Sequence, residues 1–511
     1  MQSRRESSFT DGVVILTASA VIVKLIGVCY KIPLVRLLGT EGMGYFNAAY
    51  DVYALLCMIS TTGLPVAVSV MMNKYRGQHK RIFLLSLIIF LLIGVFGAAL
   101  VFFAADTIAD RIGAPGAAQS LRFISPAVLF ICVSGALRGY YQGNRNMVPT
   151  AISQVIEAAS KLIFGLFFAY IAIMHGQGPV STAAFAVLGL SVGTLLSAGY
   201  LWLPKKHPVN LDSQGVPFRV LLAQTLKVAF PVTLGAAVSG LSKMIDLGLI
   251  MRRLQDVGYG TEASVSLYGC YSAMVIPLYS AVPALFGSVA LPLVPHLSYA
   301  IERNDIEKQR ELLGTTFRLT ALISVPGAIG MGMLSDRLLQ LLYQGSDELK
   351  VAVPLLLIIS TAVPASCLIT ATNAILQAYS RAWIPMLSTV IGCLIKAALL
   401  YYLAGLETVG ILAAPISTLL CCTVIVLINL ICIAKISPDF SFSPSWARAI
   451  TFSGIAIGAA SMLKKGMQMT WKANLPIMAI TVITAVIIYT ILAFKFGLVR
   501  ISDIKPNKEK E

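Results

Sequence analysis

The chain has 511 residues, of which 57% are hydrophobic and only 12% are charged, whereas an average soluble domain carries about 25% charged residues. Dividing the apolar residues by the roughly 20 that one helix needs to cross a bilayer gives about fourteen spans, which predicts an all-α polytopic membrane protein. A secreted enzyme, a nucleic-acid-binding module and a single-anchor receptor are excluded, because no polar stretch between the apolar runs reaches domain length.

Apolar runs separated by polar residues predict the spans in chain order. They cover residues 12–34, 46–72, 82–104, 119–142, 150–173, 181–203, 219–248, 264–295, 313–335, 351–378, 384–404, 409–434, 446–463 and 475–496. The first run follows Arg4 and Arg5 but lacks a small-residue cleavage site, so we expect the mature protein to retain it.

The net charge of +16 is expected to orient the protein in the membrane rather than to bind nucleic acid. With the N-terminus in the cytoplasm, Lys and Arg concentrate in alternate loops. This bias agrees with an even number of spans and with both termini on the cytoplasmic side of a bacterial cell membrane. The nine cysteines lie in apolar runs without CxxC spacing and the four histidines are scattered, so neither disulfides nor a metal site is predicted.

An internal repeat relates the two halves of the chain. Ser153 and Lys161 recur about 235 residues later as Ser388 and Lys396, with Val and Ile at the same places between them. The shift corresponds to six spans, an even number, so both halves enter the membrane in the same direction and form two parallel six-helix lobes. We expect an N-lobe over 1–210, a C-lobe over 211–437, two appended helices over 438–496 and a cytoplasmic tail over 497–511. A substrate path is expected between the lobes.

Ionisable residues inside spans are candidates for function, because each is costly at membrane depth. The candidate substrate-binding cations, expected to line a cleft, are Lys24, Lys31, Lys243, Arg252, Arg253 and Lys396. The candidates for coupling or for structural ion pairs are Asp51, Glu157, Lys161 and Asp246. Lys243 with Asp246, and Glu157 with Lys161, have the spacing of intrahelical pairs, so a purely structural role stays open. The excess of cations predicts an anionic substrate, for which a diphosphate is a natural candidate.

Three segments carry a resemblance to a known family. They are Lys24-Leu25-Ile26-Gly27, the run from Arg36 to Phe46, and Arg138-Gly139-Tyr140-Tyr141-Gln142-Gly143-Asn144-Arg145. The chain resembles, over nearly its whole length, the stage V sporulation protein B and MurJ-like branch of the multidrug/oligosaccharidyl-lipid/polysaccharide exporter superfamily. The resemblance implies fourteen spans and a flippase for an undecaprenyl-diphosphate-linked sugar, above all the peptidoglycan precursor lipid II, working by alternating access.

The resemblance also implies the partners of the protein. These are the lipid-linked substrate, membrane lipids and the cell-wall synthesis machinery, with no cofactor; Na⁺, H⁺ or the membrane potential would supply energy. Three other functions are alternatives to this one. A flippase for a capsular or teichoic-type unit shares the same charge pattern, a drug/cation antiporter of the superfamily would need more carboxylates, and a membrane glycosyltransferase would need larger outer loops.

Overall fold

The structure, a computed structural model, describes residues 2–437 except for 59, 61–63, 76–77, 145, 204–216, 291–292 and 344–347, together with short stretches between 446 and 495. This part of the chain consists of helices joined by turns and contains no strand. The prediction of an all-α protein is therefore confirmed. The predicted spans 446–463 and 475–496 lie only partly within the described residues, and the tail 497–511 lies wholly outside them.

The chain forms two compact units. Unit 1 comprises residues 1–273 with 404–411, and unit 2 comprises 274–403 with 412–511. The division into lobes at residue 210, which rests on the repeat alone, stays a prediction.

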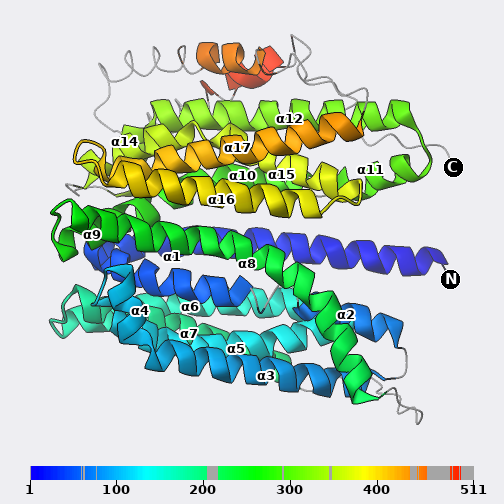
Figure 1. Ribbon diagram of the computed structural model, residues 1–511, viewed down its shortest axis with the longest axis horizontal. Coiled ribbons are helices and arrows are strands. Elements are labelled where there is room, and N and C mark those ends of the chain that lie inside the picture. The colour runs from blue at the N-terminus through cyan, green and yellow to red at the C-terminus, as the bar shows by residue number, and fades with distance from the viewer. Residues whose placement is uncertain are drawn as a thin grey trace. The chain divides into compact units, whose positions relative to one another are not determined.

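The first 273 residues of unit 1 contain nine α-helices among those that the structure describes (Figure 1). They are α1 (Gln2–Met58), α2 (Leu64–Lys74), α3 (His79–Phe103), α4 (Ala105–Ile112), α5 (Ala117–Gly143), α6 (Val148–Met174), α7 (Pro179–Trp202), α8 (Phe218–Asp256) and α9 (Thr261–Gly269). The predicted first and second spans are joined in α1, which bends at Gly39, where φ is +64°. Glycine tolerates this left-handed conformation, so it can connect two helical segments by a sharp bend.

Unit 2 begins within a π-helix, Cys270–Val275, that continues α9. It then contains α10 (Ile276–Ala290), α11 (Leu293–Glu302), α12 (Ile306–Met333), α13 (Ser335–Leu342), α14 (Leu349–Ser360), α15 (Val363–Ala378), α16 (Trp383–Ala404) and α17 (Ala413–Ile436). The repeat is visible in this order, because a short helix follows α3 and α12 alike. These short helices, α4 and α13, each carry aspartate in the first turn.

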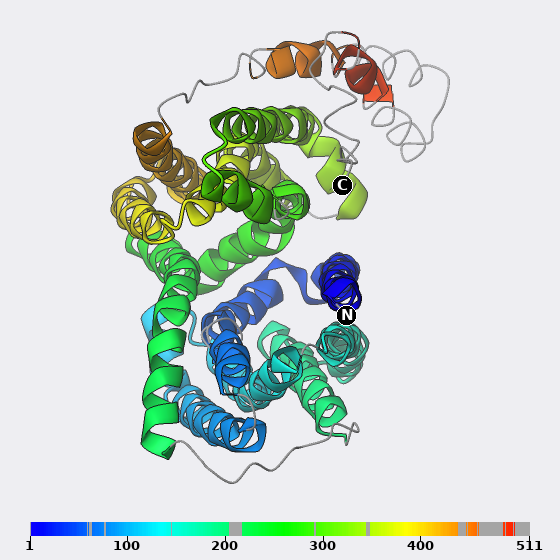
Figure 2. The same ribbon diagram turned by 90° about the vertical axis from the view of Figure 1, so that its right-hand side faces the viewer.

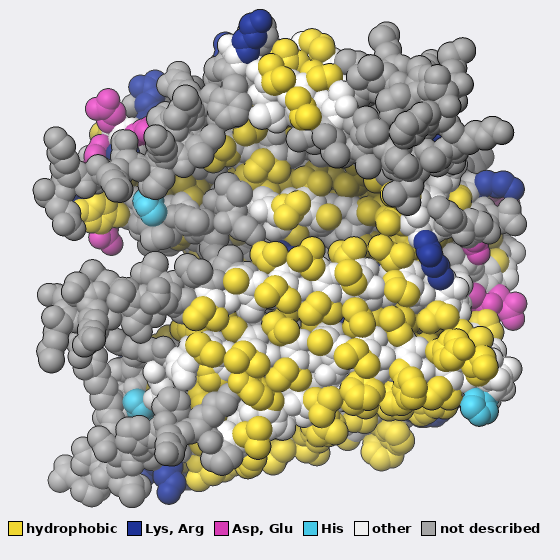
Figure 3. Space-filling model, turned by 180° about the vertical axis from the view of Figure 1, so that it is seen from behind, with side chains coloured by type: hydrophobic (Ala, Val, Ile, Leu, Met, Phe, Trp, Pro, Cys, Tyr) yellow, Lys and Arg dark blue, Asp and Glu magenta, His cyan; other side chains and the backbone are white. Residues whose placement is uncertain are grey.

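Eight helical segments in the described part of the chain are long and apolar enough to cross a membrane, and the bent pair α14 and α15, with a 43° bend, is a ninth candidate. The total of fourteen stays a prediction. Large apolar side chains on α3, such as Leu92, Phe96 and Phe103, are 65–83% exposed. Figure 3 shows hydrophobic side chains covering most of the described part of one face, with most charged side chains near its two margins. Such a surface suits lipid rather than water.

Small residues let the helices of unit 1 approach closely. In Figure 2, where many helices are seen nearly end-on, α5 lies beside α3 and α7, and α6 beside α7. A Cβ added to Gly189 of α7 would lie 2.4 Å from the Cα of Gly165 of α6. Likewise, a Cβ on Gly269 of α9 would lie 1.9 Å from the carbonyl oxygen of Thr40 of α1. This use of glycine is typical of membrane helices, whose association depends on close packing.

Candidate functional site

Charged side chains from several helices of unit 1 gather around the second half of α1. We call this group the lysine–aspartate cluster. Its members are Lys31, Asp51, Lys161, Lys243, Asp246 and Tyr268. Lys31 lies within electrostatic reach of Asp51, Lys161 and Lys243, and Asp51 within reach of Lys243 and Asp246. Five of the predicted site residues are thus brought together by α1, α6 and α8, although they are far apart in the sequence.

Two hydrogen bonds tie the cluster to α9 and the π-helix. The Tyr268 hydroxyl donates to Oδ2 of Asp51 at 2.6 Å, and Nζ of Lys31 donates to the backbone carbonyl of Ser272 at 3.2 Å. Ser272 lies in the π-helix, whose wider turn is a frequent feature of functional sites in helices. The amide of Asn47 also donates to the Ser272 hydroxyl, at 2.9 Å, which holds this turn against α1.

The cluster carries more positive than negative charge. It contains three lysines and two aspartates, and within the described residues no salt bridge joins any of these lysines to a carboxylate. Because lysines held near one another raise the local positive potential, the cluster is suited to bind an anion.

Lys161 does not pair with Glu157, the neighbour suggested by their spacing. Its ammonium lies over the rings of Tyr30 and Tyr50, 5.4 and 5.6 Å from their centroids, which are cation–π distances. Glu157 instead accepts from Arg138 of α5 at 2.8 Å. The spacing in the sequence allows an intrahelical pair between Glu157 and Lys161, but in the structure Glu157 forms an interhelical pair with Arg138.

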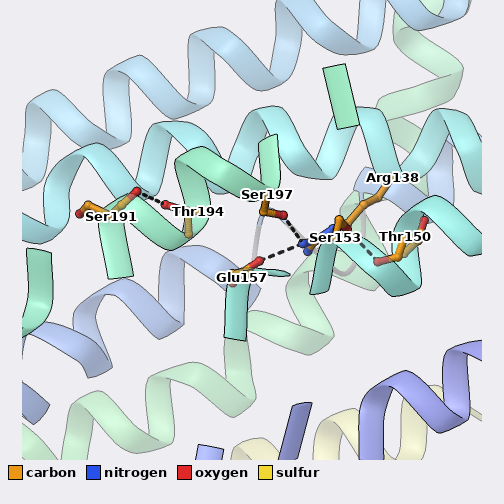
Figure 4. A network of polar contacts seen from close by, with 7 residues as sticks. All are labelled: Arg138, Thr150, Ser153, Glu157, Ser191, Thr194 and Ser197. Atoms are coloured by element: carbon orange, nitrogen blue, oxygen red, sulfur yellow. Dashed lines mark hydrogen bonds and ion pairs between the residues drawn. The ribbon is translucent and has the colours of Figure 1, made fainter. Parts of the chain in front are cut away.

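Arg138 is the centre of a buried polar network, shown in Figure 4. Besides Glu157, its guanidinium donates to the hydroxyls of Ser153 on α6 at 3.0 Å and Ser197 on α7 at 3.1 Å. Arg138 is only 6% exposed, so every partner is needed to offset its burial. Sequence reasoning missed Arg138 as a partner, although its place inside the apolar run 119–142 marked it as costly.

Unit 2 has a neutral network at the equivalent place. Asn429 of α17 accepts from the Ser388 hydroxyl at 2.8 Å and donates to Thr372 and Asn373, both at 3.0 Å. In the repeat register that pairs Ser153 with Ser388, Arg138 corresponds to Asn373. Polar contacts therefore join three corresponding helices in each half, α5 to α7 in unit 1 and α15 to α17 in unit 2. The contacts involve charged side chains in unit 1 and amides in unit 2.

Apart from Glu157, four predicted site residues lie outside the cluster. Lys24 is exposed on α1, and it is not among the charges acting on Lys31 or Asp51. Near the end of α8, Arg252 donates to the backbone carbonyl of Asp110 at 3.2 Å, and Arg253 pairs with Asp256 at 2.8 Å. The fourth, Lys396, is 5% exposed within unit 2, on α16.

The described residues contain no group of three or more His, Cys, Asp or Glu side chains that could hold a metal ion. The predicted absence of a metal site and of any other cofactor remains an expectation for the whole chain.

Long apolar helices, a charged cluster between helices and a repeated helical order define a multi-pass membrane transporter. A family described as polysaccharide biosynthesis protein matches residues 9–300, and one described as MatE matches residues 268–402. The first match covers more than half of the chain, which therefore belongs to the polysaccharide biosynthesis protein family, within the multidrug/oligosaccharidyl-lipid/polysaccharide exporter superfamily.

Individual proteins with similar sequences support this family assignment. The chain is 26% identical over 451 residues to stage V sporulation protein B of Bacillus subtilis (strain 168), covering 85% of each chain. It is 23% identical over 422 residues to lipid II flippase MurJ of the same organism, covering 77% of each. The resemblance inferred from the sequence motifs is thus confirmed.

Solved structures confirm the fold. Lipid II flippase MurJ in an inward closed conformation matches 95% of this chain and 100% of its own, with a TM-score of 0.75 and 16% identity. A multidrug resistance MATE family transporter in an inward-facing conformation matches 84% of this chain and 100% of its own, with a TM-score of 0.66 and 16% identity.

Proposed function

We propose that this protein flips an undecaprenyl-diphosphate-linked cell-wall precursor, above all lipid II, from the inner to the outer leaflet of the bacterial cell membrane. The observation that carries the proposal is the excess of lysine over aspartate in the lysine–aspartate cluster of unit 1. A diphosphate is the part of such a lipid that lysines recognise, since the ammonium is a strong point-charge ligand for phosphate. The membership of the polysaccharide biosynthesis protein family supports a substrate of this class.

The same charge balance weighs against a drug/cation antiporter, although the MatE family matches residues 268–402. A cationic passenger would meet like charges at Lys31, Lys161 and Lys243, and like charges brought close together repel one another. Alternating access between the two leaflets would draw on an ion gradient or on the membrane potential, and it requires no bound cofactor.

Leaflet-resolved detection of lipid II tests the proposal. In a strain that lacks other flippases of the superfamily, depletion of this protein is expected to trap lipid II in the inner leaflet, and re-expression of the wild type to release it. Accumulation of a capsular or teichoic-type lipid-linked unit instead, with lipid II unchanged, would assign the alternative substrate. If neither lipid accumulates, the flippase proposal is wrong.

A further inference from the structure

Asp51 is a carboxylate placed among cations and held away from them. Its Oδ2 accepts the Tyr268 hydroxyl at 2.6 Å, and in the described residues it forms no salt bridge with a lysine. The charged or titratable groups that act on it are Lys31 of α1, Lys243 and Asp246 of α8, and Tyr268 of α9. Tyr268 is 2% exposed, so this hydrogen bond ties the partly exposed carboxylate of Asp51 to a buried side chain.

The geometry has a consequence for the lysines. A carboxylate in direct contact with an ammonium would occupy the donors that a phosphate needs. Because Tyr268 holds Asp51 by hydrogen bonding, the ammonium groups of Lys31 and Lys243 keep donors for a ligand, while the nearby negative charge lowers the positive potential they create.

The affinity of the cluster for a ligand then depends on the number of charges that the ligand carries. A lipid diphosphate that carries a sugar has one ionised oxygen on each phosphate, and the corresponding monophosphate has one in total. Three lysines alone would hold either anion tightly and release it slowly. With Asp51 and Asp246 ionised the cluster has a single excess positive charge, which favours weaker binding and faster release.

We propose that Asp51 is a built-in counter-charge that sets the affinity of the lysine–aspartate cluster for a lipid-linked diphosphate and permits its release. The inference rests on the proposed function and adds to it a residue that determines affinity and charge selectivity. Asp51 contacts no substrate in this role. It acts through Lys31 and Lys243, and its position depends on Tyr268.

The test measures binding and dissociation of two probes by the purified full-length protein in lipid nanodiscs. The probes are a polyprenyl-diphosphate-linked N-acetylglucosamine and the polyprenyl-monophosphate-linked sugar with the same chain. Asp51→Asn removes the charge and keeps a hydrogen-bond acceptor for Tyr268. It is expected to bind the diphosphate about tenfold more tightly than the wild type, mainly through slower dissociation, and to bind the monophosphate with a smaller gain.

Two controls separate charge from structure. Asp51→Glu keeps the charge and Tyr268→Phe keeps Asp51 but removes its hydrogen bond, so neither is expected to tighten diphosphate binding. Asp51→Ser is a second neutral variant, because a serine hydroxyl also accepts a hydrogen bond from Tyr268. If Tyr268→Phe tightens binding as much as Asp51→Asn does, the effect is structural and the proposal is wrong.

The remaining outcomes are also decisive. Unchanged or weaker diphosphate binding by folded Asp51→Asn overturns the inference while leaving the proposed function intact. Failure of both neutral variants to fold would make Asp51 a structural residue, which also overturns it. If the wild type binds neither probe, the proposed function itself fails.

Discussion

Lys31 and Lys243 are the two lysines whose charges act directly on Asp51, and each is a candidate contact for a diphosphate. Replacing either with Gln is expected to remove a charge-assisted hydrogen bond of roughly 1.5–3 kcal/mol, or about ten- to a hundredfold in affinity. Lys31→Arg and Lys243→Arg keep the charge and should retain most binding. Equilibrium binding of the polyprenyl-diphosphate probe to purified variants measures these effects.

Lys24→Gln is the comparison variant for this series. Lys24 lies on α1 like Lys31, but it is not among the charges that act on Asp51, so its removal is expected to weaken binding less than that of Lys31 or Lys243. Wild-type affinity in both Lys31→Gln and Lys243→Gln would mean that the cluster is structural. A larger loss for Lys24→Gln would place the substrate near the exposed side of α1 instead.

The sequence identified the charged residues of the lysine–aspartate cluster, but not their hydrogen-bond partners. Asp51, Lys31 and Lys243 were all identified by one physical criterion, the cost of an ionisable group at membrane depth. Their partners depend on tertiary structure, because Tyr268 lies 217 residues from Asp51 and Ser272 lies 241 from Lys31. For Glu157, local spacing favoured Lys161, but Arg138 on another helix offers a planar donor set with two serines to share it. No periodic pattern in the sequence predicts such an interhelical contact.

At the scale of helices, the crossing of α1 and α9 sets the position of Tyr268 and Ser272. The crossing depends on glycine, since a Cβ on Gly269 would lie 1.9 Å from the backbone carbonyl oxygen of Thr40, and one on Gly44 would lie 2.3 Å from that of Val265. Backbone atoms cannot move aside as a flexible side chain would. The hydroxyls of Thr40 and Ser266, 2.7 Å apart, add a polar contact at the same place.

Gly269→Ala is therefore expected to destabilise unit 1 by about 1–3 kcal/mol, the usual cost of overpacking, and to lower its melting temperature in detergent. Gly248→Ala is the matched control, because Gly248 of α8 has no heavy atom within 4 Å of an added Cβ and alanine favours helix there. Equal melting temperatures for the two variants would show that α1 and α9 separate easily.

The π-helix that follows α9 is a feature of helix geometry that the sequence did not predict. The apolar run 264–295 was expected as one regular span, and the run of residues Cys270–Val275 has no proline or charge to mark a change of helix type. The wider turn is stabilised by contacts with α1, through Asn47 and Lys31 to Ser272. Only tertiary structure provides these partners.

Across the whole molecule, the repeat places a polar network in each half, and comparing the two indicates what the charges of the first half contribute. Arg138 and Glu157 of unit 1 correspond to Asn373 and Gly392 of unit 2 in the register that pairs Ser153 with Ser388. In unit 2 the hydrogen bonds at these positions join amides and hydroxyls. The ion pair is therefore one of two solutions to the same packing problem, and a neutral replacement of both charges should be tolerated.

This comparison predicts how three variants rank in stability. Glu157→Ala leaves the 6% exposed Arg138 without its carboxylate and is expected to cost roughly 2–4 kcal/mol, somewhat below the cost for a fully buried pair because Glu157 retains 22% side-chain exposure. Arg138→Asn alone should cost less, since a short amide can still reach hydroxyl partners. The double variant, which imitates unit 2, is expected to be more stable than Glu157→Ala alone, because no buried charge then remains unpaired.

Thermal unfolding of the purified variants in detergent measures this order. Glu311→Ala, which removes the exposed Lys308–Glu311 pair of α12 with side-chain exposures of 39% and 62%, is the control and should cost less than about 1 kcal/mol. If Glu157→Ala is no worse than Glu311→Ala, the Arg138 network does not stabilise the helices of unit 1. If the stability loss of the double variant equals the sum of the losses of the two single variants, Arg138 and Glu157 act independently. The networks of the two halves would then correspond in position but not in how they stabilise their helices.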